Sequence, residues 1–432
     1  MKIYQKIMYA TAALCLFGTA LASVSKINAQ ASQTMAKYDI VKIMNPIWEG
    51  ETSYMESVLV VENEYGGIDP IQLLYPIEEI IEVKDAKLSK TYQKGVDYTE
   101  SGGKLIIADD GDIPIFSYEE FHPTTGQEGF QDKNGGYICF HEEDFFHSRQ
   151  IVVTYTHKAA YEGYVPENKG DLLPKVTDKL QNSEDLDLLV FGDSISVGAN
   201  SSGFVEVEPY MPSYPQLFAN HLQLVYGNKV NLVNPSVGGK GVEWGISEID
   251  GVLQKCKNID LAVIAFGMND GNMAPATFAQ KTASLAEKIQ AKFPDVEIML
   301  VATMLPNPDA KSFDRNQGKF HDALAEMLET EGVAVVNVTA VHESLLQKKR
   351  YADMTGNNIN HPNDYIARVY AQTLFATLQQ KVEIEETSSA EESQEDDGLC
   401  SLLSGCNATA SLTIGATAAA AATVVLKKKK DD

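Results

Sequence analysis

The chain has 432 residues, 44% of them hydrophobic and 22% charged, which is ordinary for a globular protein and long enough for two domains. Its formal net charge of −25 argues against sequence-independent binding to nucleic acid, because that binding needs clustered lysine and arginine. The five cysteines are too few for a disulfide framework, and none shows the close spacing of a structural zinc site.

Residues 1–31 have the pattern of a secretory signal peptide. Two lysines are followed by an apolar run over residues 7–21, and small residues at 20–22 and 29–31 offer cleavage sites. The apolar run is short for a membrane span, so a retained anchor is the weaker alternative. We therefore expect the protein to be exported.

Residues 35–175 have the texture of an antiparallel β-domain. Short alternating or β-branched runs such as "SVLVVENE", "KLIIADD" and "QIVVTYTH" are separated by Gly, Asp and Pro. Within this region "KGVDYTESGGKLII" predicts two strands joined by a Gly-Gly turn. The pattern predicts a β-sandwich-like domain at the N-terminal end of the mature chain.

One stretch of this region, "CFHEEDFFHS", gathers residue types that bind metals. The two histidines are six residues apart, which fits neither one face of a helix nor a familiar zinc spacing. An acidic surface loop is the better interpretation, and we expect no metal and no organic cofactor. The residues concerned are His141, Glu142, Glu143, Asp144 and His147.

Residues 184–382 alternate short apolar runs with amphipathic helical stretches. The runs "LDLLVF", "VNLV", "LAVIAF", "IMLVAT" and "VAVVNV" predict strands buried on both faces, hence a parallel sheet covered by helices. Ligands of such sheets gather at the carboxyl ends of the strands. Two helices show an apolar stripe each, made of Phe278, Leu285 and Ile289 in one and of Ile366, Tyr370, Leu374 and Leu378 in the other.

Polar groups follow several of these predicted strands. "LDLLVF" ends in Gly-Asp-Ser at 192–194, "VNLV" runs into residues 234–239 (Asn-Pro-Ser-Val-Gly-Gly), and "LAVIAF" runs into residues 267–270 (Gly-Met-Asn-Asp). Asn-His-Pro-Asn occupies residues 360–363, directly before the last amphipathic stretch. We expect all four groups to face one crevice.

These groups supply what acyl transfer requires. Ser194 is a nucleophile once a base takes its proton, and His361 is the candidate base. Pro362 favours a helix that starts there, which leaves the imidazole at the mouth of the sheet. The backbone N–H groups of Ser194 and Gly239, with the side-chain amide of Asn269, would stabilise the oxyanion of the tetrahedral intermediate.

The order Gly-Asp-Ser, Asn…Gly, Gly-x-Asn-Asp and a late His-Pro-Asn resembles the SGNH or GDSL hydrolases. The resemblance implies a flavodoxin-like, three-layer α/β/α hydrolase domain with a parallel sheet over residues 184–382. It also implies a Ser–His catalytic pair, Ser194 and His361, and an oxyanion hole made by Ser194, Gly239 (or Gly238 in another alignment) and Asn269.

One position departs from the family pattern. The family usually has Asp three residues before the histidine, but here that position is Asn358, which would orient the imidazole without supplying a negative charge. Asp353, Asp364 or a backbone carbonyl are alternative orienting groups. A catalytic dyad and a non-catalytic protein both remain open.

The context suggests a substrate. Tyr210, Tyr214 and Trp244 lie in the segments after the first two motifs and would either bind a sugar ring or pack in the core. Export and an extra β-domain favour a serine esterase that removes small acyl groups, above all acetyl, from extracellular carbohydrate. A lipid or peptidoglycan O-acyl esterase is one alternative, and a non-catalytic carbohydrate-binding or adhesion protein is another.

The C-terminal end predicts attachment to the cell surface. Residues 383–405 are acidic and serine-rich at first and predict a disordered linker. Residues 406–432 hold an uncharged stretch followed by four lysines, which predicts a membrane anchor with cytoplasmic lysines and an extracellular body, a loose helical tail being the alternative. Whether Cys400 and Cys406 are bridged stays open.

Overall fold

A five-stranded parallel sheet is the centre of the structure, a computed structural model that describes residues 37–125 and 130–379. Its strand order is β8-β7-β9-β10-β11. Counted from β7, this is the flavodoxin-like order 2-1-3-4-5, in which ligands bind where the order reverses, between β7 and β9. The strands are β7 (Leu186–Gly192), β8 (Val230–Val233), β9 (Leu261–Ala265), β10 (Glu297–Ala302) and β11 (Val333–Asn337).

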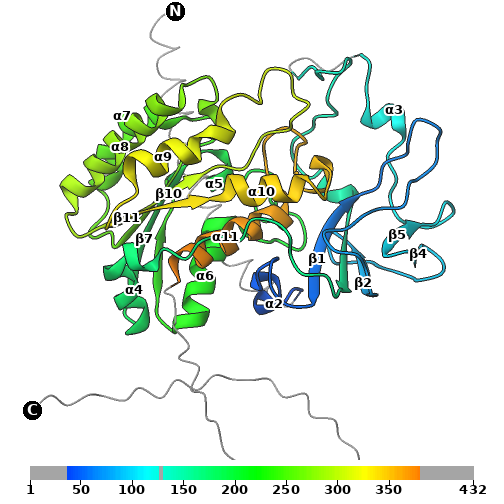
Figure 1. Cartoon of the computed structure of the whole chain (residues 1–432), viewed down its shortest axis with the longest axis horizontal. Helices are drawn as coiled ribbons and strands as arrows, with labels where there is room; N and C mark the ends of the chain where they lie inside the picture. The colour runs from blue at the N-terminus through cyan, green and yellow to red at the C-terminus, as the bar shows by residue number, and fades with distance from the viewer. Residues whose placement is uncertain (1–36, 126–129, 380–432) are drawn as a thin grey trace, which may run out of the picture. The chain divides into compact units, whose positions relative to one another are not determined.

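Both faces of the sheet are buried along β7, β9, β10 and β11, whereas the edge strand β8 is only partly buried, contrary to the prediction for "VNLV". Alternate residues of the buried strands face different helices. In β7, Leu188 and Val190 belong to one hydrophobic cluster, whereas Leu189 and Phe191 belong to another. The helices α7, α8 and α9 cover the second face, and α6 and α11 cover the first (Figure 1). These helices are α6 (Tyr214–Tyr226), α7 (Val242–Leu253), α8 (Pro275–Lys292), α9 (Phe320–Leu328) and α11 (Asp364–Leu378).

An antiparallel sheet precedes this domain in the chain. Its order is β1-β6-β2-β3, and a separate hairpin pairs β4 with β5 around Gly102 and Gly103, both at positive φ as the predicted turn requires. The predicted fold class, a parallel α/β/α domain after a β-domain, is confirmed. The strands are β1 (Thr52–Leu59), β2 (Glu79–Asp85), β3 (Thr91–Tyr92), β4 (Tyr98–Ser101), β5 (Lys104–Ile107) and β6 (Gln150–Thr156).

Helix α11 joins the two sheets. Thirteen of its fifteen residues are buried, so it has no solvent-facing stripe of the kind that the sequence predicts. Buried polar side chains of α11 bind the backbone of the N-terminal region: Gln372 donates to Ile43 O at 2.8 Å, and Arg368 donates to Tyr54 O. The described residues accordingly belong to one compact unit.

The start of α11 differs from the prediction. The helix begins at Asp364 and not at Pro362, because the side chain of Asn363 accepts a hydrogen bond from the N–H of Ile366 and caps the helix. The imidazole of His361 therefore lies on a loop before the cap. The remaining helices are α2 (Ile40–Met44), α3 (Tyr118–Phe121), α4 (Pro174–Gln181), α5 (Ser194–Val197) and α10 (Val338–Leu346).

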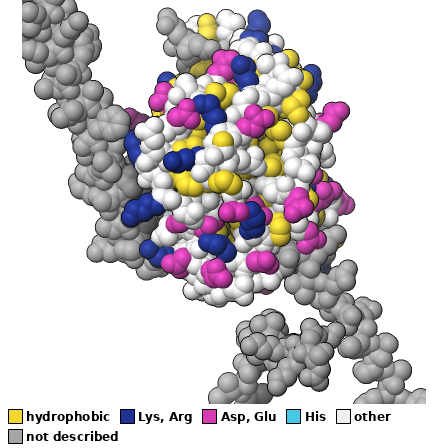
Figure 2. Space-filling model, turned by 90° about the vertical axis from the view of Figure 1, so that its left-hand side faces the viewer, with side chains coloured by type: hydrophobic (Ala, Val, Ile, Leu, Met, Phe, Trp, Pro, Cys, Tyr) yellow, Lys and Arg dark blue, Asp and Glu magenta, His cyan; other side chains and the backbone are white. Residues whose placement is uncertain are grey.

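The signal peptide predicted over 1–31 and the linker and anchor predicted over 383–405 and 406–432 lie outside the described residues, as do Cys400 and Cys406. Among the residues that are described, no helix is long and apolar enough to cross a membrane. The boundary between 35–175 and 184–382 stays a prediction. On the face that Figure 2 displays, acidic and basic side chains are interspersed.

Candidate active site

Ser194 stands at the carboxyl end of β7, as the first residue of α5. Asp193 caps this short helix by accepting a hydrogen bond from the N–H of Ile195 at 3.0 Å. Gly192 allows the turn to pass close to β9, since a Cβ at this position would lie 2.4 Å from the carbonyl oxygen of Ala265. The serine is only 7% exposed.

His361 lies next to this serine although 167 positions separate the two in the chain. Its Nε2 is 3.0 Å from Ser194 Oγ. The backbone of the histidine is held on both sides, because its N–H donates to Asn357 Oδ1 at 3.1 Å and its carbonyl accepts from the hydroxyl of Thr355 at 3.0 Å. The base is thus fixed within hydrogen-bond reach of the hydroxyl whose proton it would take.

The other ring nitrogen, Nδ1, faces Asn200. Asn200 Oδ1 is 2.6 Å from Nδ1, and Asn200 Nδ2 donates to the carbonyl of Glu143 at 3.0 Å, which fixes the amide with its oxygen toward the ring. Nδ1 therefore carries the proton and donates to Asn200. The lone pair of Nε2 is left to accept the proton of Ser194, as a general base requires.

Two further polar groups reach this edge of the ring. Asn357 Nδ2 lies 3.0 Å from Nδ1, but its two hydrogens have acceptors in Glu142 Oε1 at 3.3 Å and Asn360 Oδ1 at 3.1 Å. Glu142 Oε2 lies 3.4 Å from Nδ1, and its side chain is 49% exposed. Partial burial by itself raises the pKa of Glu142. The hydrogen bond and charge of His361 and the hydrogen bond from Asn357 lower it by more, so the pKa of Glu142 lies below its usual range.

The structure does not place Asn358 as an orienting group for the imidazole. The left-handed backbone of Asn358 (φ 65°) directs its side chain elsewhere: Nδ2 donates to the carbonyl of Cys139 at 3.1 Å, and Oδ1 accepts from Asn307 at 3.2 Å. The expected interaction is replaced by the contact between Asn200 and Nδ1.

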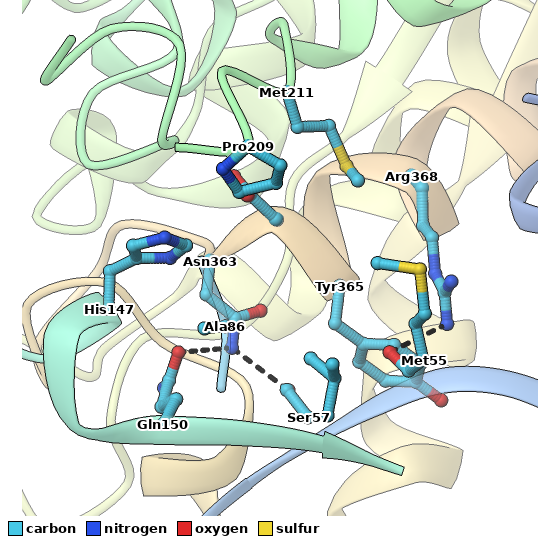
Figure 3. A pocket seen from close by; sticks show the side chains of 12 residues that line it. Met55, Ser57, Ala86, His147, Gln150, Pro209, Met211, Asn363, Tyr365 and Arg368 are labelled. Atoms are coloured by element: carbon cyan, nitrogen blue, oxygen red, sulfur yellow. Dashed lines mark hydrogen bonds between the residues drawn. The ribbon is translucent and has the colours of Figure 1, made fainter. Parts of the chain in front are cut away.

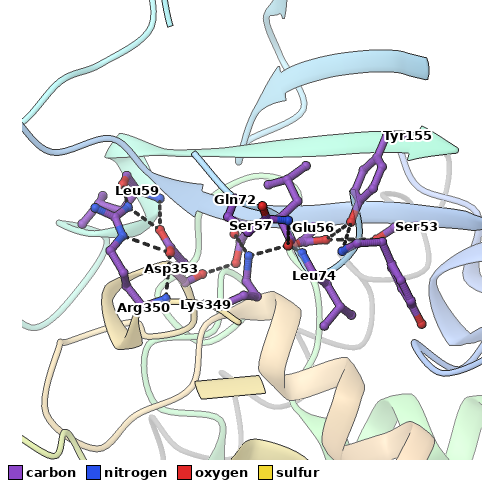
Figure 4. A network of polar contacts seen from close by, with 12 residues as sticks. Ser53, Glu56, Ser57, Leu59, Gln72, Leu74, Tyr155, Lys349, Arg350 and Asp353 are labelled. Atoms are coloured by element: carbon purple, nitrogen blue, oxygen red, sulfur yellow. Dashed lines mark hydrogen bonds and ion pairs between the residues drawn. The ribbon is translucent and has the colours of Figure 1, made fainter. Parts of the chain in front are cut away.

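The two acidic alternatives are also engaged elsewhere. Asp353 pairs with Arg350 at 2.7 Å and accepts from the N–H of Leu59 at 2.9 Å (Figure 4). Asp364 accepts from the backbone and the hydroxyl of Ser202 at 2.9 and 2.6 Å. Both carboxylates fix the backbone around the site and make no hydrogen bond to the imidazole.

The predicted oxyanion donors follow the carboxyl ends of β7, β8 and β9. Within the described part of the chain, the backbone N–H groups of Ser194 and Gly239 have no acceptor, so both are free to bind an oxyanion. Gly239 adopts φ 71°, and a Cβ on the preceding Gly238 would lie 3.6 Å from Ser194 Cβ. Asn269 Nδ2 donates one hydrogen to the carbonyl of Lys240 at 3.0 Å, which orients the amide and leaves its second hydrogen available.

The aspartates of the Gly-Asp-Ser and Asn-Asp motifs hold the loops that carry these donors. Asp193 accepts from the start of α5, and Asp270 accepts from the N–H of Val242 at the start of α7 at 3.0 Å. Burial raises the pKa of Asp193 to about 7 and that of Asp270 to about 6. Their role in the geometry is to fix backbone beneath the site.

The aromatic residues predicted to line the crevice have other neighbours. Tyr214 is buried, bonds Ser196 Oγ at 2.7 Å and stacks on Tyr370 at 5.0 Å, so it belongs to the core. The ring of Trp244 packs at 5.5 Å from Phe191 in the cluster beneath α7. No hydrogen bond or ring contact among the described residues joins half-buried Tyr210 to Ser194 or His361.

The histidines of the "CFHEEDFFHS" stretch do not converge on Glu142. His141 stacks on Phe145 at 3.8 Å. His147 is buried, contacts the carbonyl of Glu208 at 2.8 Å and lines a cavity of about 20 Å³ between the antiparallel sheet, the loop that holds Pro209 and Met211, and α11 (Figure 3). The surface-loop interpretation thus fits Glu142 and Glu143, which are exposed, and does not fit His147.

Three contacts of the imidazole were missed in the sequence: Asn200, Asn357 and Glu142. Asn200 follows Ser194 by six residues in "SISVGANSS", where Gly-Ala-Asn favours a turn and gives no sign of a role. Glu142 stands one residue from a second glutamate in an acidic run. No sequence signal distinguishes it, since its role depends on how the β-domain meets the α/β domain.

One family model matches the part of the chain that holds this site. Residues 190–369 match the model of the GDSL-like lipase/acylhydrolase family, whereas no curated protein sequence matches the chain. A two-domain esterase active on acetylated mannans, solved with mannopentaose, aligns at 19% identity and a TM-score of 0.41 over 49% of this chain and 54% of its own. This chain thus spans about half of that esterase.

Two further solved structures are similar to a little under half of this chain. The acetylxylan esterase Axe2 from Geobacillus stearothermophilus has 16% identity and a TM-score of 0.38 over 45% of this chain and 95% of its own. TesA has 22% identity and a TM-score of 0.33 over 45% of this chain and 98% of its own. Similarity at this level says nothing about substrate. The residues that match the GDSL-like lipase/acylhydrolase family model, 190–369, hold the Ser194–His361 pair.

Proposed function

We propose that the protein is a serine esterase that removes small acyl groups, above all acetyl, from carbohydrate through an acyl-enzyme. The observation that carries the proposal is the 3.0 Å contact between Ser194 Oγ and His361 Nε2, with Nδ1 held by Asn200. This is the nucleophile, base and orienting group that acyl transfer to a hydroxyl needs.

In the first half of the reaction, Ser194 Oγ attacks the carbonyl carbon of the ester while its proton passes to His361 Nε2. The carbonyl oxygen becomes an oxyanion that accepts hydrogen bonds from the N–H groups of Ser194 and Gly239 and from Asn269 Nδ2. The intermediate collapses by breaking the bond to the sugar oxygen, which takes the proton from Nε2 and leaves as an alcohol.

In the second half, water replaces the alcohol. Nε2 of His361 takes a proton from the water as its oxygen attacks the carbonyl of the acyl-enzyme, and the same donors bind the second oxyanion. When the bond to Ser194 Oγ breaks, the proton on Nε2 returns to the serine and the carboxylic acid is released. The enzyme is then in its starting state, and the net reaction consumes one water.

Replacing Asn269 by alanine tests the oxyanion hole. We expect kcat for p-nitrophenyl acetate to fall by about 10²–10³-fold with little change in KM, because the lost donor acts on charge that develops only in the transition state. Steady-state kinetics measures both parameters. A variant that raised KM and kept kcat would show that Asn269 binds the ground state, contrary to this assignment.

Two features support a small acyl group on a polar alcohol. Ser194 is 7% exposed and His361 9%, which leaves little room for a bulky acyl chain above the nucleophile. Two groups on the imidazole side, Glu142 and Asn360, are polar and suit hydroxyl groups better than an apolar chain. Action on extracellular carbohydrate, by a protein anchored at its C-terminal end, also rests on the sequence patterns of residues 1–31 and 406–432.

Chain-length preference tests this choice. We expect the purified protein to hydrolyse p-nitrophenyl acetate with a kcat/KM at least about tenfold higher than p-nitrophenyl octanoate, because a site closed over the nucleophile clashes with the longer chain. A chain kept in water also gains none of the roughly 0.8 kcal/mol that burial of each methylene supplies. Acetylated and deacetylated oligosaccharides, followed by acetate release, then identify the alcohol. Faster turnover of octanoate would point to a lipid esterase, and acetate release from acetylated peptidoglycan alone would select the O-acyl alternative.

A further inference from the structure

The carboxylate that lies near the imidazole of His361 comes from outside the matched family domain. Asn358 holds the position three residues before His361, and no carboxylate of residues 190–369 bonds the ring in the structure. The carboxylate nearest to Nδ1 is that of Glu142, at 3.4 Å, which lies in the N-terminal β-region between β5 and β6. The negative charge beside the imidazole would then be supplied by the N-terminal β-region and not by the matched domain.

Three asparagines of the α/β domain hold this segment against the site. Asn200 Nδ2 donates to the carbonyl of Glu143 at 3.0 Å, Asn358 Nδ2 donates to the carbonyl of Cys139 at 3.1 Å, and Asn357 Nδ2 donates to Glu142 Oε1 at 3.3 Å. Two of these hydrogen bonds are accepted by backbone carbonyls. They therefore fix the path of the segment that carries Glu142 without depending on its side chains. The third directs the carboxylate of Glu142 itself.

Resting on the proposed function, we propose that Glu142 is a positioning residue of the esterase: its carboxylate stabilises the imidazolium that forms at His361 during catalysis, while Asn200 fixes the tautomer. The two tasks that one aspartate performs in the usual triad are divided between an amide and a carboxylate. Asn358 contributes indirectly, by holding the segment that carries the charge.

The surroundings of Glu142 are simple enough for a test by pH. The titratable group that faces its carboxylate is His361, and Asn200 and Asn357 beside it carry no charge. Glu143, its neighbour in the chain, is exposed, and Asp144 pairs with Lys87 at 3.4 Å. A negative charge beside the ring favours the protonated imidazole. Removing it should therefore move the acidic limb of the pH–rate profile to lower pH.

The experiment compares Glu142→Gln with Asp144→Asn in the full chain on p-nitrophenyl acetate. Glutamine keeps the acceptor for Asn357 and removes only the charge, and Asp144→Asn removes one charge from the same loop away from the site. We expect Glu142→Gln to lower kcat about tenfold and to move the acidic limb of kcat/KM down by about half to one pH unit, as a charge 3.4 Å away in largely solvated surroundings would. Asp144→Asn should match the wild type.

Salt gives a readout that needs no variant. Because the Glu142 side chain is 49% exposed, raising the ionic strength from about 0.02 to about 0.5 M should screen it and move the wild-type limb toward that of Glu142→Gln. The inference is overturned if the acidic limb of the kcat/KM profile is the same for Glu142→Gln and Asp144→Asn. If Glu142→Gln does not fold, the inference is overturned if the acidic limb of the wild type does not change with salt. Hydrolysis that persists in Ser194→Ala would instead overturn the proposed function.

Discussion

Replacing Ser194 by alanine should lower kcat for p-nitrophenyl acetate by about 10⁵–10⁶-fold, because the variant lacks the hydroxyl that forms the acyl-enzyme. The reason is geometric: Ser194 Oγ is the hydroxyl within 3.0 Å of His361 Nε2, and the backbone N–H of the same residue is one of the oxyanion donors. The alanine variant keeps that N–H, so substrate binding and the fold should change little. Steady-state kinetics and thermal melting measure the two effects.

Three variants make this result specific. Ser247→Ala removes an exposed serine on α7 whose hydroxyl bonds only nearby groups of that helix, and it should keep wild-type kinetics. His361→Ala should lose about as much activity as Ser194→Ala, and the double variant should be no worse than either single one, because nucleophile and base act as a unit. Independent, multiplicative losses in the double variant would contradict a Ser–His pair.

Much of this site could be predicted because most of its residues directly follow the carboxyl ends of predicted strands. In a parallel sheet the residues that leave the carboxyl ends must meet, so Ser194, Gly239 and Asn269 could be brought together from three apolar runs and the polar residues after them. His361 followed from its place directly before the last amphipathic stretch. The order of the strands in the sheet was predicted from the family resemblance and not from the apolar runs.

The orienting group could not be predicted, and the reason is physical. Position 358 is three residues before the histidine, but the left-handed backbone there turns the side chain toward Cys139. The contacts that replace it, from Asn200 and Glu142, depend on tertiary packing between segments 161 and more positions from His361. The missing aspartate left a non-catalytic scaffold open, and the contact of Asn200 with Nδ1 gives the imidazole an orienting group that does not depend on position 358.

The same packing explains the error about α11. A stripe of four apolar residues predicts a helix with one buried face, and such a stripe exists. The opposite face carries Arg368 and Gln372, two polar residues that the sequence alone assigns to solvent. In the structure, Gln372 donates a hydrogen bond to the carbonyl of Ile43, and Arg368 donates one to the carbonyl of Tyr54. Burial lowers the pKa of Arg368 to about 10, as expected for a guanidinium enclosed between two parts of the chain.

A buried ion pair at this junction should make the fold sensitive to the loss of either partner. Lys349 Nζ lies 2.6 Å from Glu56 Oε1, and the two side chains are 1% and 0% exposed (Figure 4). Lys349 also donates to the carbonyl of Ser57, and Glu56 accepts from the hydroxyl of Tyr155 at 2.7 Å and the N–H of Leu74 at 2.8 Å. The pair thus ties β1 to the segment that leads to His361.

Lys349→Met should therefore lower the free energy of unfolding by about 3–5 kcal/mol, because it leaves the carboxylate of Glu56 buried with neutral donors only. Lys348→Met is the matched control: that lysine is 44% exposed and pairs at 3.0 Å with Glu162, which is 75% exposed, so its loss should cost at most about 1 kcal/mol. Urea unfolding followed by circular dichroism measures both.

The double variant Glu56→Gln with Lys349→Met separates the charge from the packing. Removing both charges should recover part of the stability lost in Lys349→Met, since the cost of that variant is an uncompensated buried carboxylate and not the loss of a favourable contact. If Lys349→Met unfolded within 1 kcal/mol of Lys348→Met, the carboxylate would have to be solvated or protonated without its partner. The junction between the two sheets would then be far more open to water than the full burial of both side chains implies.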